Sequence, residues 1–590
     1  MYVRLKRQKK SANPTVQVLE SYREGDKIKQ RLIASLGVVK NEEDRTNLIH
    51  VGHALIAKLS AEREAQNPQT SFNLSEIDHE EFDQSGAKKA RVVKGELPVY
   101  ASNLVHIRTE NSGFTDVFGK LSQQLGFDDV LQEVDRSGDH AFSVLEIIRS
   151  LFIQRIQEPA SKRRSLFHEL EQKGHLSFEL HHVYRAMDVL LPFSEKIQEA
   201  AHFAAANLLG RKVECYFYDA TTLYFESVAT NELMDFGYGK DGKFNQSQIL
   251  LCLLVTEEGI PVGYEIFSGK TAETKTLATA LEKLSKRYEI TGSTLVGDRG
   301  ILSQDNIAAA KLNKMHFILG EKLRGLPKKY VDTILDIQLY TSIGNEKTPF
   351  FVREMPHPTR GDDVKLILGY SADRAKKDKS DRERLLDKVK KRLAKKKKTT
   401  PKEFISNRGV LKYVTATGGE AKLNLEAIAR EEKWDGFFGI ATNHPTLSHT
   451  GVIGQYRGLW QVEAQFRNYK HNLEARPIYH WTPDRIRTHV LTCFMSLCLE
   501  RHLELILKKS GVSLTTLNIH DALRRCENVI FQDKKSNRIF SMESNKSIEA
   551  RAIYSSVGLN PRSTTREICD PKAPVVPSLH SVKPQLSGIR

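Results

Sequence analysis

The chain has 590 residues, of which 40% are hydrophobic, and a formal net charge of +16. Because a single hydrophobic core stops growing at about 250–300 residues, this length predicts several domains. The six cysteines include no CxxC pair, which excludes a disulfide framework and indicates a reducing cytosol. The start, MYVRLKRQKK, lacks the apolar stretch of a signal peptide, and the run VLTCFMSLCL is too short to cross a bilayer, so we expect a soluble intracellular protein.

The basic residues are spread along the chain and are not confined to a tail. They recur near the start in RLKRQKK, in SKRR at 161–164, and between Arg374 and Lys398. A polyanion that contacts several domains explains this spread, and double-stranded DNA fits that description.

Residues 1–40 form the first predicted unit, a basic β-hairpin segment. YVRLKRQ, TVQVLESY and KIKQRLIASLG are short strand patterns, separated by the turn signals NP and EGDK. Arg4, Lys6 and Gln8 lie on one face of the first strand, where they either contact DNA phosphates or form a solvated edge. A helix, NLIHVGHALIAKLSAERE, and a polar linker are expected within residues 41–111.

Residues 112–210 are predicted to be helical throughout and to form a DNA-binding domain. Apolar residues recur at intervals of three and four in segments such as SVLEIIRSLFIQRIQ, and Gly or Pro ends each segment. One helix begins with Lys162, Arg163 and Arg164. Cations at a helix start oppose the helix dipole, so they need another reason to be present. Contact with the DNA backbone and chance placement on a surface are the two readings.

A mixed α/β sheet is predicted to begin at residue 211. VECYFYDATTLYF, SQILLCLLVTEEG and IPVGYEIFSG read as three strands joined by tight turns, followed by a helix, the strand STLVGDRG, a second helix and the strand HFILGEKL. A β-rich insertion with a charged helix, a long amphipathic helix and a loose tail rich in Ser and Pro come after it. The expected parts are residues 211–324 (first part of a catalytic core), 325–445 (insertion), 446–510 (second part of the core) and 511–590 (C-terminal segment and tail).

Three acidic residues stand where a structural carboxylate is out of place. Asp219 interrupts the strand-like stretch YFYDATTLYF, and Asp298 ends a strand at the edge where open α/β sheets bind their ligands. Glu463 is expected on the apolar stripe of its helix, one turn beyond Leu459, with Lys470 on nearly the same face. The three carboxylates are therefore candidates for one site.

Two carboxylates from a sheet and one from a helix packed on it can hold hard divalent cations, which prefer oxygen ligands. A pair of such ions activates a water or hydroxyl group and stabilises the leaving oxygen of a phosphodiester. Lys470 would face the same pocket as a point charge for a phosphate. The alternative is that Arg299, Arg467 or another base pairs with each carboxylate in a structural ion pair.

The stretches YDATTLYFES, LVGDRGILSQDN and YRGLWQVEAQFRNYKHNL, together with the region from FGYGKDGKF to KTAETKTL, carry a family resemblance. The chain resembles a DDE transposase of a bacterial insertion sequence, from the branch whose ribonuclease-H-like core is interrupted by a β-rich insertion. The resemblance implies that Asp219, Asp298 and Glu463 are the catalytic residues and that they bind Mg²⁺ or Mn²⁺, as two ions.

The glutamate helix of that family carries the signature Y-x2-R-x3-E-x6-K, whose arginine and lysine contact DNA phosphates near the cleaved end. Tyr456, Glu463 and Lys470 match the signature, whereas Leu459 stands at the arginine position. The nearest arginine, Arg457, points about 200° away around a regular helix and does not simply replace the missing one.

The remaining DNA-binding candidates lie on the same helix and in the insertion. Arg457 and Arg467 are basic residues close to the glutamate. Trp434 is a candidate because related enzymes hold a flipped base or a hairpin end on an aromatic residue of the insertion. The alternative for this tryptophan is a place in a hydrophobic core.

The resemblance implies an enzyme that binds the terminal inverted repeats of its element, cuts there, and joins the freed 3′-OH ends to target DNA. The ends must be brought together, which implies a homodimer on double-stranded DNA in the bacterial cytoplasm, at the nucleoid. Two alternatives remain: a catalytically inactive DNA-binding descendant of such an enzyme, and a metal-dependent nuclease on the same core.

Overall fold

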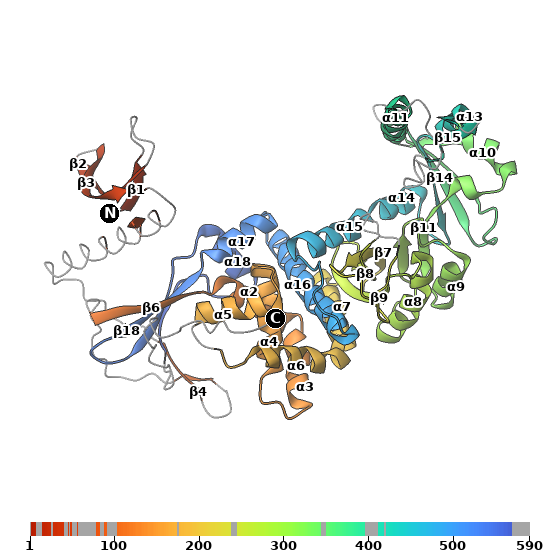
Figure 1. The fold of residues 1–590 in the computed structure, drawn as a ribbon. Helices are drawn as coiled ribbons and strands as arrows, with labels where there is room; N and C mark the ends of the chain where they lie inside the picture. The colour runs from red at the N-terminus through yellow and green to blue at the C-terminus, as the bar shows by residue number, and fades with distance from the viewer. Residues whose placement is uncertain are drawn as a thin grey trace. The chain divides into compact units, whose positions relative to one another are not determined.

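The computed structural model of the protein forms two compact units (Figure 1). Unit 1 combines Met1–Asn111, Arg525–Lys546 and Arg562–Arg590. Unit 2 combines Ser112–Arg524 and Ser547–Pro561. The structure describes residues 2–6, 14–24, 27–39, 78–82, 88–90, 103–173, 176–237, 245–343, 350–395, 411–417 and 420–568, and a few isolated residues between 45 and 56.

The first three strands of unit 1 form an antiparallel sheet in chain order, as the sequence predicts. They are β1 (Tyr2–Lys6), β2 (Thr15–Glu24) and β3 (Lys27–Val38). Lys6 is exposed, and Arg4 lies 3.5 Å from Oε1 of Gln30. Gln8 and most of the helix expected after residue 46 lie outside the described residues.

A six-stranded sheet in unit 1 joins distant parts of the chain in the order β5-β4-β20-β19-β18-β6. Leu104 pairs with Asp533, for example. The range expected to be a polar linker thus contributes three strands, and order continues to Ile568, into the range expected to be a loose tail. The strands are β4 (Asp78–Phe82), β5 (Lys88–Ala90), β6 (Leu104–Asn111), β18 (Glu527–Asp533), β19 (Ile539–Glu543) and β20 (Thr565–Ile568).

Unit 2 begins with the helices that the sequence predicts. They are α2 (Gly113–Gln124), α3 (Phe127–Arg136), α4 (Val144–Gln157), α5 (Lys162–Lys173), α6 (Leu180–Leu190) and α7 (Ser194–Leu209). Ser143 caps α4 by accepting a hydrogen bond from the Glu146 amide, and Gly210 ends α7 with a φ of 69°. The long helix α16 (Pro483–Lys509) packs against α2, α4, α6, α7 and the sheet, so it is buried along most of its length.

The sheet of unit 2 has nine strands in the order β12-β13-β14-β17-β11-β10-β7-β8-β9. Five of them are the strands predicted for the core: β7 (Cys215–Tyr224), β8 (Gln248–Thr256), β9 (Pro261–Ser268), β10 (Thr294–Gly297) and β11 (His316–Glu321). Strands β7 to β9 are antiparallel, and β10 runs parallel to both β7 and β11. The helices α8 (Thr276–Arg287) and α9 (Gln304–Leu312) connect β9 to β10 and β10 to β11.

The two faces of β7 have different neighbours. Tyr216 and Tyr218 belong to the same buried cluster as Leu281 of α8. Successive side chains of a strand point to opposite faces, so Phe217 points away from α8. On that second face, a Cβ on Gly458 would lie 2.5 Å from the Phe217 ring, which shows how closely the chain crosses there.

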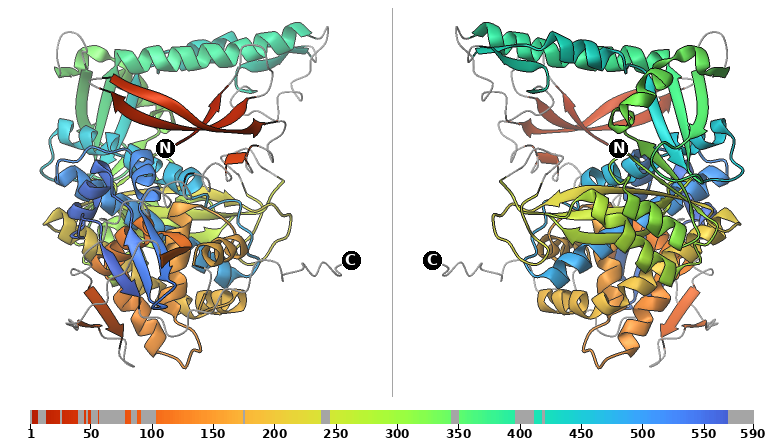
Figure 2. Two further views of the ribbon diagram at one scale, coloured as in Figure 1. Left: turned by 90° about the vertical axis from the view of Figure 1, so that its left-hand side faces the viewer. Right: turned by 90° about the vertical axis from the view of Figure 1, so that its right-hand side faces the viewer.

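Four strands of the insertion, β12, β13, β14 and β17, extend the sheet of the core, whereas β15 and β16 pair with each other in a separate two-stranded sheet. Strand β17 pairs with β11 of the core on one side and with β14 on the other. The long charged helix α11 crosses beside these strands as the long green helix of Figure 2. The elements are α10 (Val331–Leu335), β12 (Thr341–Ile343), β13 (Phe350–Pro356), β14 (Lys365–Ser371), α11 (Ala372–Lys395), β15 (Val414–Thr417), β16 (Glu420–Leu423), α13 (Leu425–Glu432) and β17 (Phe437–Thr442).

The helix expected to carry the candidate glutamate is divided into three pieces. They are α14 (His449–Arg457), α15 (Trp460–Arg467) and a π-helical turn, Asn468–Asn472. The helices α17 (Thr516–Arg524) and α18 (Ile548–Ser556) complete unit 2. No helix among the described residues combines the length and the apolar character needed to cross a membrane.

Candidate active site

Asp219 and Asp298 are neighbours on adjacent parallel strands. Gly297, the last residue of β10, is in register with Tyr218 of β7. Asp298 follows Gly297, and Asp219 follows Tyr218. Residues in register on neighbouring strands point to the same face of a sheet. Both aspartates therefore lie on the face that carries Phe217, away from α8. We call them the aspartate pair.

The aspartate pair has access to water although its strands are buried. Eight residues of β7 are buried, whereas Asp219 is only half-buried, and Asp298 is half-buried as well. Oδ1 of Asp219 accepts a hydrogen bond from the Ala220 amide at 2.8 Å, and Oδ1 of Asp298 accepts one from the Gly300 amide at 2.7 Å. This partial exposure explains how β7 accommodates a carboxylate in its most apolar stretch.

A third carboxylate, Glu273, lies beside Asp298. A Cβ on Gly300 would lie 2.9 Å from Oδ1 of Asp298 and 3.0 Å from Oε2 of Glu273. Glu273 begins the single turn that precedes α8. The sequence interpretation missed it, because only the fold brings this turn next to the end of β10. The signal was present in the motif KTAETKTL, where an acidic residue precedes a helix start.

Asn306 ties the Glu273 turn to the turn after Asp298. Its side-chain amide donates to the carbonyl of Thr274 at 2.9 Å and to the carbonyl of Ile301 at 2.5 Å. Asn306 is fully buried. Since both acceptors belong to the backbone, this single side chain fixes the two carboxylate-bearing turns relative to each other.

Glu463 is not placed as the sequence predicts. The expected stripe put it on the buried face of its helix, but its side chain is exposed, and Val462, Gln465 and Phe466 are buried instead. The helix break near Gly458 changes which residues of α15 face the sheet, since α15 begins anew at Trp460. Among the described residues, no group of three or more His, Cys, Asp or Glu side chains is gathered closely enough to hold a metal ion.

Helix α15 nevertheless packs against β7 and β8, so Glu463 belongs to an element that covers the strand of Asp219. Lys470 lies in the π-helical turn that follows α15 and is half-buried. The π turn changes the angle per residue, so the expectation that Lys470 shares the direction of Glu463 does not apply. Arg467, at the end of α15, is exposed.

Tyr456 lies close to the aspartate pair. Its hydroxyl would be 2.3 Å from a Cβ on Gly320 of β11, so this strand position has room only for glycine. Burial, together with the nearby Asp298 carboxylate, raises the pKa of Tyr456. Tyr456 is therefore a neutral hydroxyl beside Asp298. Arg457, the next residue, points elsewhere and lies over the ring of Phe350, 4.9 Å from its centroid.

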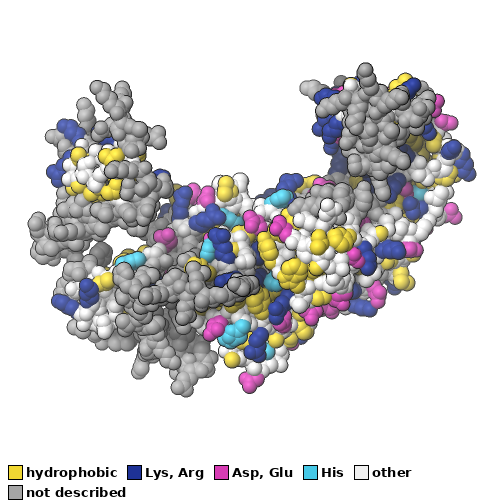
Figure 3. Space-filling view, viewed as in Figure 1, with side chains coloured by type: hydrophobic (Ala, Val, Ile, Leu, Met, Phe, Trp, Pro, Cys, Tyr) yellow, Lys and Arg dark blue, Asp and Glu magenta, His cyan; other side chains and the backbone are white. Residues whose placement is uncertain are grey.

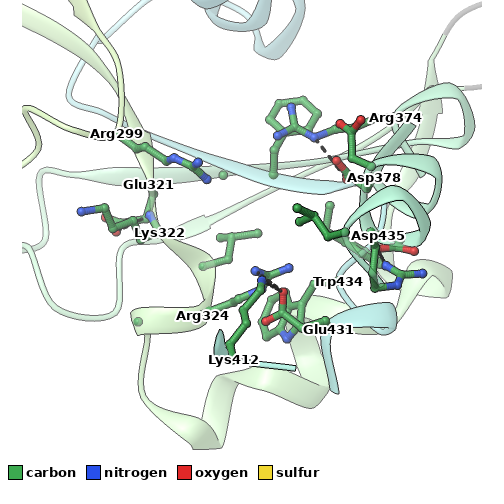
Figure 4. Close-up of a pocket in the computed structure, with 18 of the residues that line it drawn as sticks. Arg299, Glu321, Lys322, Arg324, Arg374, Asp378, Lys412, Glu431, Trp434 and Asp435 are labelled. Atoms are coloured by element: carbon green, nitrogen blue, oxygen red, sulfur yellow. Dashed lines mark hydrogen bonds and ion pairs between the residues drawn. The ribbon is translucent and has the colours of Figure 1, made fainter. Parts of the chain in front are cut away.

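A cavity of about 720 Å³ connects this region with the insertion (Figure 4). Arg299 and Tyr456 line it from the core, and Trp434 lines it from the insertion. Trp434 also packs against a small buried cluster around Ile334, so both readings of this residue apply: one part is core, the other faces the cavity.

Six basic and five acidic side chains line the cavity. Glu431 pairs with Lys412 at 2.6 Å and with Arg324 at 3.0 Å, which brings two cations next to Trp434 (Figure 4). In the space-filling view, dark blue basic side chains are visible over the insertion (Figure 3). The basic residues lining the cavity are Arg299, Lys322, Arg324, Arg374, Arg382 and Lys412.

Lys162, Arg163 and Arg164 lie apart from the aspartate pair, at the start of α5. Arg163 and Arg164 are exposed, as a role on a surface requires. Lys162 is buried, although both readings of the sequence, contact with the DNA backbone and chance surface placement, predict an exposed side chain.

Comparison with known proteins identifies this arrangement. Residues 213–499 match the family model described as "Transposase DDE domain", and this range contains both aspartates of the pair. Residues 3–70 match "IS1634 family transposase, N-terminal domain". The chain belongs to the DDE transposases of insertion sequences.

Among solved structures, a piggyBac transposase synaptic complex with hairpin DNA gives a distant match, with 8% identity and a TM-score of 0.33 over 70% of this chain and 77% of that chain. No curated protein sequence matches the chain.

Proposed function

We propose that the protein binds the terminal inverted repeats of its insertion sequence, cleaves DNA there, and joins the 3′-OH ends to target DNA. The observation that carries the proposal is the aspartate pair: two carboxylates on adjacent strands of one face, inside the residues that match a DDE domain. Two carboxylates on one face repel each other, and a bound cation between them relieves that repulsion.

The topology supports a ribonuclease-H-like core. Three antiparallel strands, β7 to β9, are followed by β10 and β11, which add in parallel on the far side of β7. This order and these directions are those of the ribonuclease-H-like sheet named for the family, and β12 to β14 with β17 represent the insertion that widens it.

The donor set fits divalent metal ions. The space at Gly300 is lined by carboxylate oxygens of Asp298 and Glu273, which are the hard ligands that Mg²⁺ and Mn²⁺ prefer. Asp219, Asp298 and Glu463 would hold two ions, with Glu273 close to Asp298. When bound, such ions activate a nucleophile and stabilise the leaving oxygen.

The proposal requires Glu463 to turn its side chain toward the aspartate pair. Glu463 is exposed, so no packing holds its side chain in the present direction, and exposed side chains change rotamer within nanoseconds. Helix α15 already lies on β7. We assign to Glu463 the completion of the carboxylate set when DNA and metal are bound.

Residues around the aspartate pair would hold the DNA. Tyr456 presents a neutral hydroxyl beside Asp298, and Arg299 lines the cavity that leads to Trp434. An aromatic surface with cations around it suits an unpaired base with its phosphates. Further positive charge comes from Arg457 and Arg467, at the ends of α14 and α15, and from Lys470 in the π-helical turn. The exposed Arg163 and Arg164 would contact the backbone of the duplex.

The remaining parts of the proposal concern partners and place. Joining two element ends requires both in one complex, so we assign a homodimer on double-stranded DNA. The net charge of +16 suits this polyanion. The protein would act in the bacterial cytoplasm, at the nucleoid.

The test uses the DNA that flanks the gene. Purified protein is mixed with a duplex carrying both element ends, with Mg²⁺ or with EDTA, and compared with Asp298→Asn and Glu463→Gln. Two variants serve as matched controls. Asp305→Asn changes an exposed aspartate on the nearby helix α9, and Glu289→Gln changes the ion-pair partner of Lys212. Mn²⁺ binding is followed by electron paramagnetic resonance.

We expect metal-dependent cleavage and strand transfer in the wild type and in both controls, and neither in the two site variants. Mn²⁺ affinity should fall in Asp298→Asn. Specific binding of the ends without cleavage would replace the proposal with the DNA-binding descendant. Cleavage without strand transfer would replace it with the nuclease.

A further inference from the structure

A second cavity, of about 570 Å³, lies at the start of α5, away from the aspartate pair. The end of α4, the start of α5, residues 474–480 and α16 enclose it. Five Lys and Arg side chains line it together with one carboxylate, and we call it the cation cavity. The charged and titratable lining residues are Arg155, Lys162, Arg163, Arg164, Tyr184, Glu474, Arg476, Tyr479, His480 and His489.

Lys162 is the residue hardest to explain without a ligand. It is 5% exposed, and among the described residues no carboxylate forms an ion pair with it. Burial, reinforced by the charge of Arg155, lowers the pKa of Lys162 to about 7. A buried ammonium without a counter-charge is costly for the folded state.

Arg155 adds a second buried cation at the same place. It is 6% exposed and donates to the carbonyl oxygens of Ala160 at 2.8 Å, Leu473 at 3.4 Å and Glu474 at 3.5 Å. These acceptors are neutral, so they orient the guanidinium without neutralising its charge. The only carboxylate in the lining, Glu474, is exposed.

The histidines of the cation cavity respond to the same field. Burial, and next to it the charge of Lys162, lowers the pKa of His480 to about 3 and lowers that of His489 well below its usual value. Both are therefore neutral. His489 donates its Nε2–H to the carbonyl of Ala475 at 3.1 Å, which leaves His480 as the histidine donor for a ligand. The Asp188 carboxylate acts on His480 in the opposite direction and is held by Arg485 at 3.1 Å.

The start of α5 directs further positive charge toward the cavity. The Ser161 hydroxyl accepts from the Arg164 amide at 3.3 Å, and the first turn of α5 contains no acidic residue. Its backbone amides and the helix dipole favour an anion at this end. Three consecutive cations at a helix start oppose the helix dipole when no ligand is bound, whereas a bound tetrahedral anion makes them favourable.

We propose that the cation cavity binds one phosphate group of the DNA backbone, with Lys162 and Arg155 as its buried ligands. The inference rests on the proposed function and extends it: residues 473–480 follow directly on the π-helical turn with Lys470, so a phosphate held here fixes the DNA strand to the segment that continues from the glutamate helix.

Sulfate is the probe for the site, because its charge does not change between pH 6 and pH 9. Thermal unfolding of the full chain is measured while sulfate replaces chloride at constant ionic strength, without DNA and without metal. The variants are Lys162→Met, Lys162→Arg, and Lys286→Met as a control, since Lys286 is exposed on α8 and pairs with Glu282 at 2.9 Å.

We expect a saturable rise of the Tm with sulfate in the wild type and in Lys286→Met, and none in Lys162→Met. In the wild type the affinity for sulfate should fall about tenfold per pH unit above pH 7, because binding requires the protonated lysine. Lys162→Arg, which stays protonated, should bind sulfate without this pH dependence. A sulfate response that is equal in wild type and Lys162→Met, when both are folded, would overturn the proposal.

A second arm separates DNA phosphate from free phosphate. With the duplex of element ends bound, sulfate should no longer raise the Tm, and Lys162→Met should reduce the slope of log affinity for DNA against log salt by about one. A sulfate response that persists on saturating DNA would assign the cavity to a free anion and overturn the DNA assignment. Neither arm depends on cleavage, so a failure of the catalytic proposal leaves this result readable.

Discussion

The aspartate pair and the cation cavity gather like charges in two different ways. Asp219 and Asp298 lie side by side at a half-buried face, where water reaches them. Lys162 and Arg155 are almost fully buried. Water screens the first group and not the second. The aspartate pair places two like charges on one face, and no carboxylate among the described residues forms an ion pair with Lys162. We propose an external ligand of opposite sign for each group.

A third charged group shows the ordinary structural solution. The Glu321 carboxylate, at the end of β11, accepts hydrogen bonds from His357 at 2.8 Å and from Arg360 at 2.8 Å. Although its burial opposes this, the bonds from His357 and Arg360 lower the pKa of Glu321 to about 2. Removing charge should thus have opposite consequences at Glu321 and at the aspartate pair.

The largest expected effect is on activity. Asp298→Asn should reduce cleavage of the element ends by about 1,000-fold or more, because a lost metal ligand removes several kcal/mol of transition-state stabilisation. Its free energy of unfolding, measured by urea without metal, should be unchanged or higher, since one of two like charges is gone. A loss of several kcal/mol would break the comparison and assign Asp298 to a structural ion pair.

The matching change at Glu321 should act on stability. Glu321→Gln should lower the free energy of unfolding by about 3 kcal/mol, because it leaves Arg360 and His357 without their carboxylate. In the wild type, a carboxylate with a pKa lowered to about 2 contributes stability that is full above about pH 4.5 and is lost as the pH falls toward 2. Acid unfolding curves of the two proteins should converge in that window; parallel curves would refute the assignment.

The cation cavity predicts a pH dependence of the same sign, but in a higher pH range. Lys162 has a pKa of about 7 in the folded protein and an ordinary, higher value when unfolded, so the unfolded state binds more protons between these values. Stability should therefore rise with pH above 7, by up to about 1.4 kcal/mol per pH unit. The measurement is the difference in unfolding free energy between wild type and Lys162→Met in anion-poor buffer at pH 7, 8 and 9. A constant difference would show that Lys162 does not titrate there.

The smallest effect concerns the link between the carboxylate turns. Asn306→Ala should cost about 1–3 kcal/mol, because two backbone carbonyls lose their donor in a buried place. The rate of DNA cleavage should fall by more than the loss of folding stability explains, since Glu273 is no longer held beside Asp298. Asn313→Ala is the control: it removes one hydrogen bond to Ala309 at the end of the same helix. Equal effects of the two changes on cleavage would deny Asn306 a positioning role.

The aspartate pair could be predicted because its signal is local. An aspartate in a run of β-branched and aromatic residues, and another at the end of an apolar strand, are visible without a fold. Glu273 could not be found in this way, because its distance from Asp298 depends on how α8 returns the chain to the sheet. The exposure of Glu463 was missed for a different reason: a period of 3.6 residues was assumed across Gly458, where the helix restarts.

The pairing of strands that lie far apart in the chain also could not be predicted from the sequence. The strand pattern at Leu104–Asn111 finds its partner at Glu527–Asp533, and no local signal specifies that choice. The burial of Lys162 is a similar case. Its position at a helix start was predicted, but whether a side chain there faces water or the next helix depends on tertiary packing.

Strand β17 has a mechanical consequence for the insertion. It is hydrogen-bonded to β11 along one edge and to β14 along the other, and β11 borders the strand that ends at Asp298. A lobe joined to its core by such a ladder cannot swing about a flexible hinge without breaking backbone hydrogen bonds. The ladder therefore fixes the separation between Trp434 and the aspartate pair. A DNA strand bound between them would have to span that fixed distance.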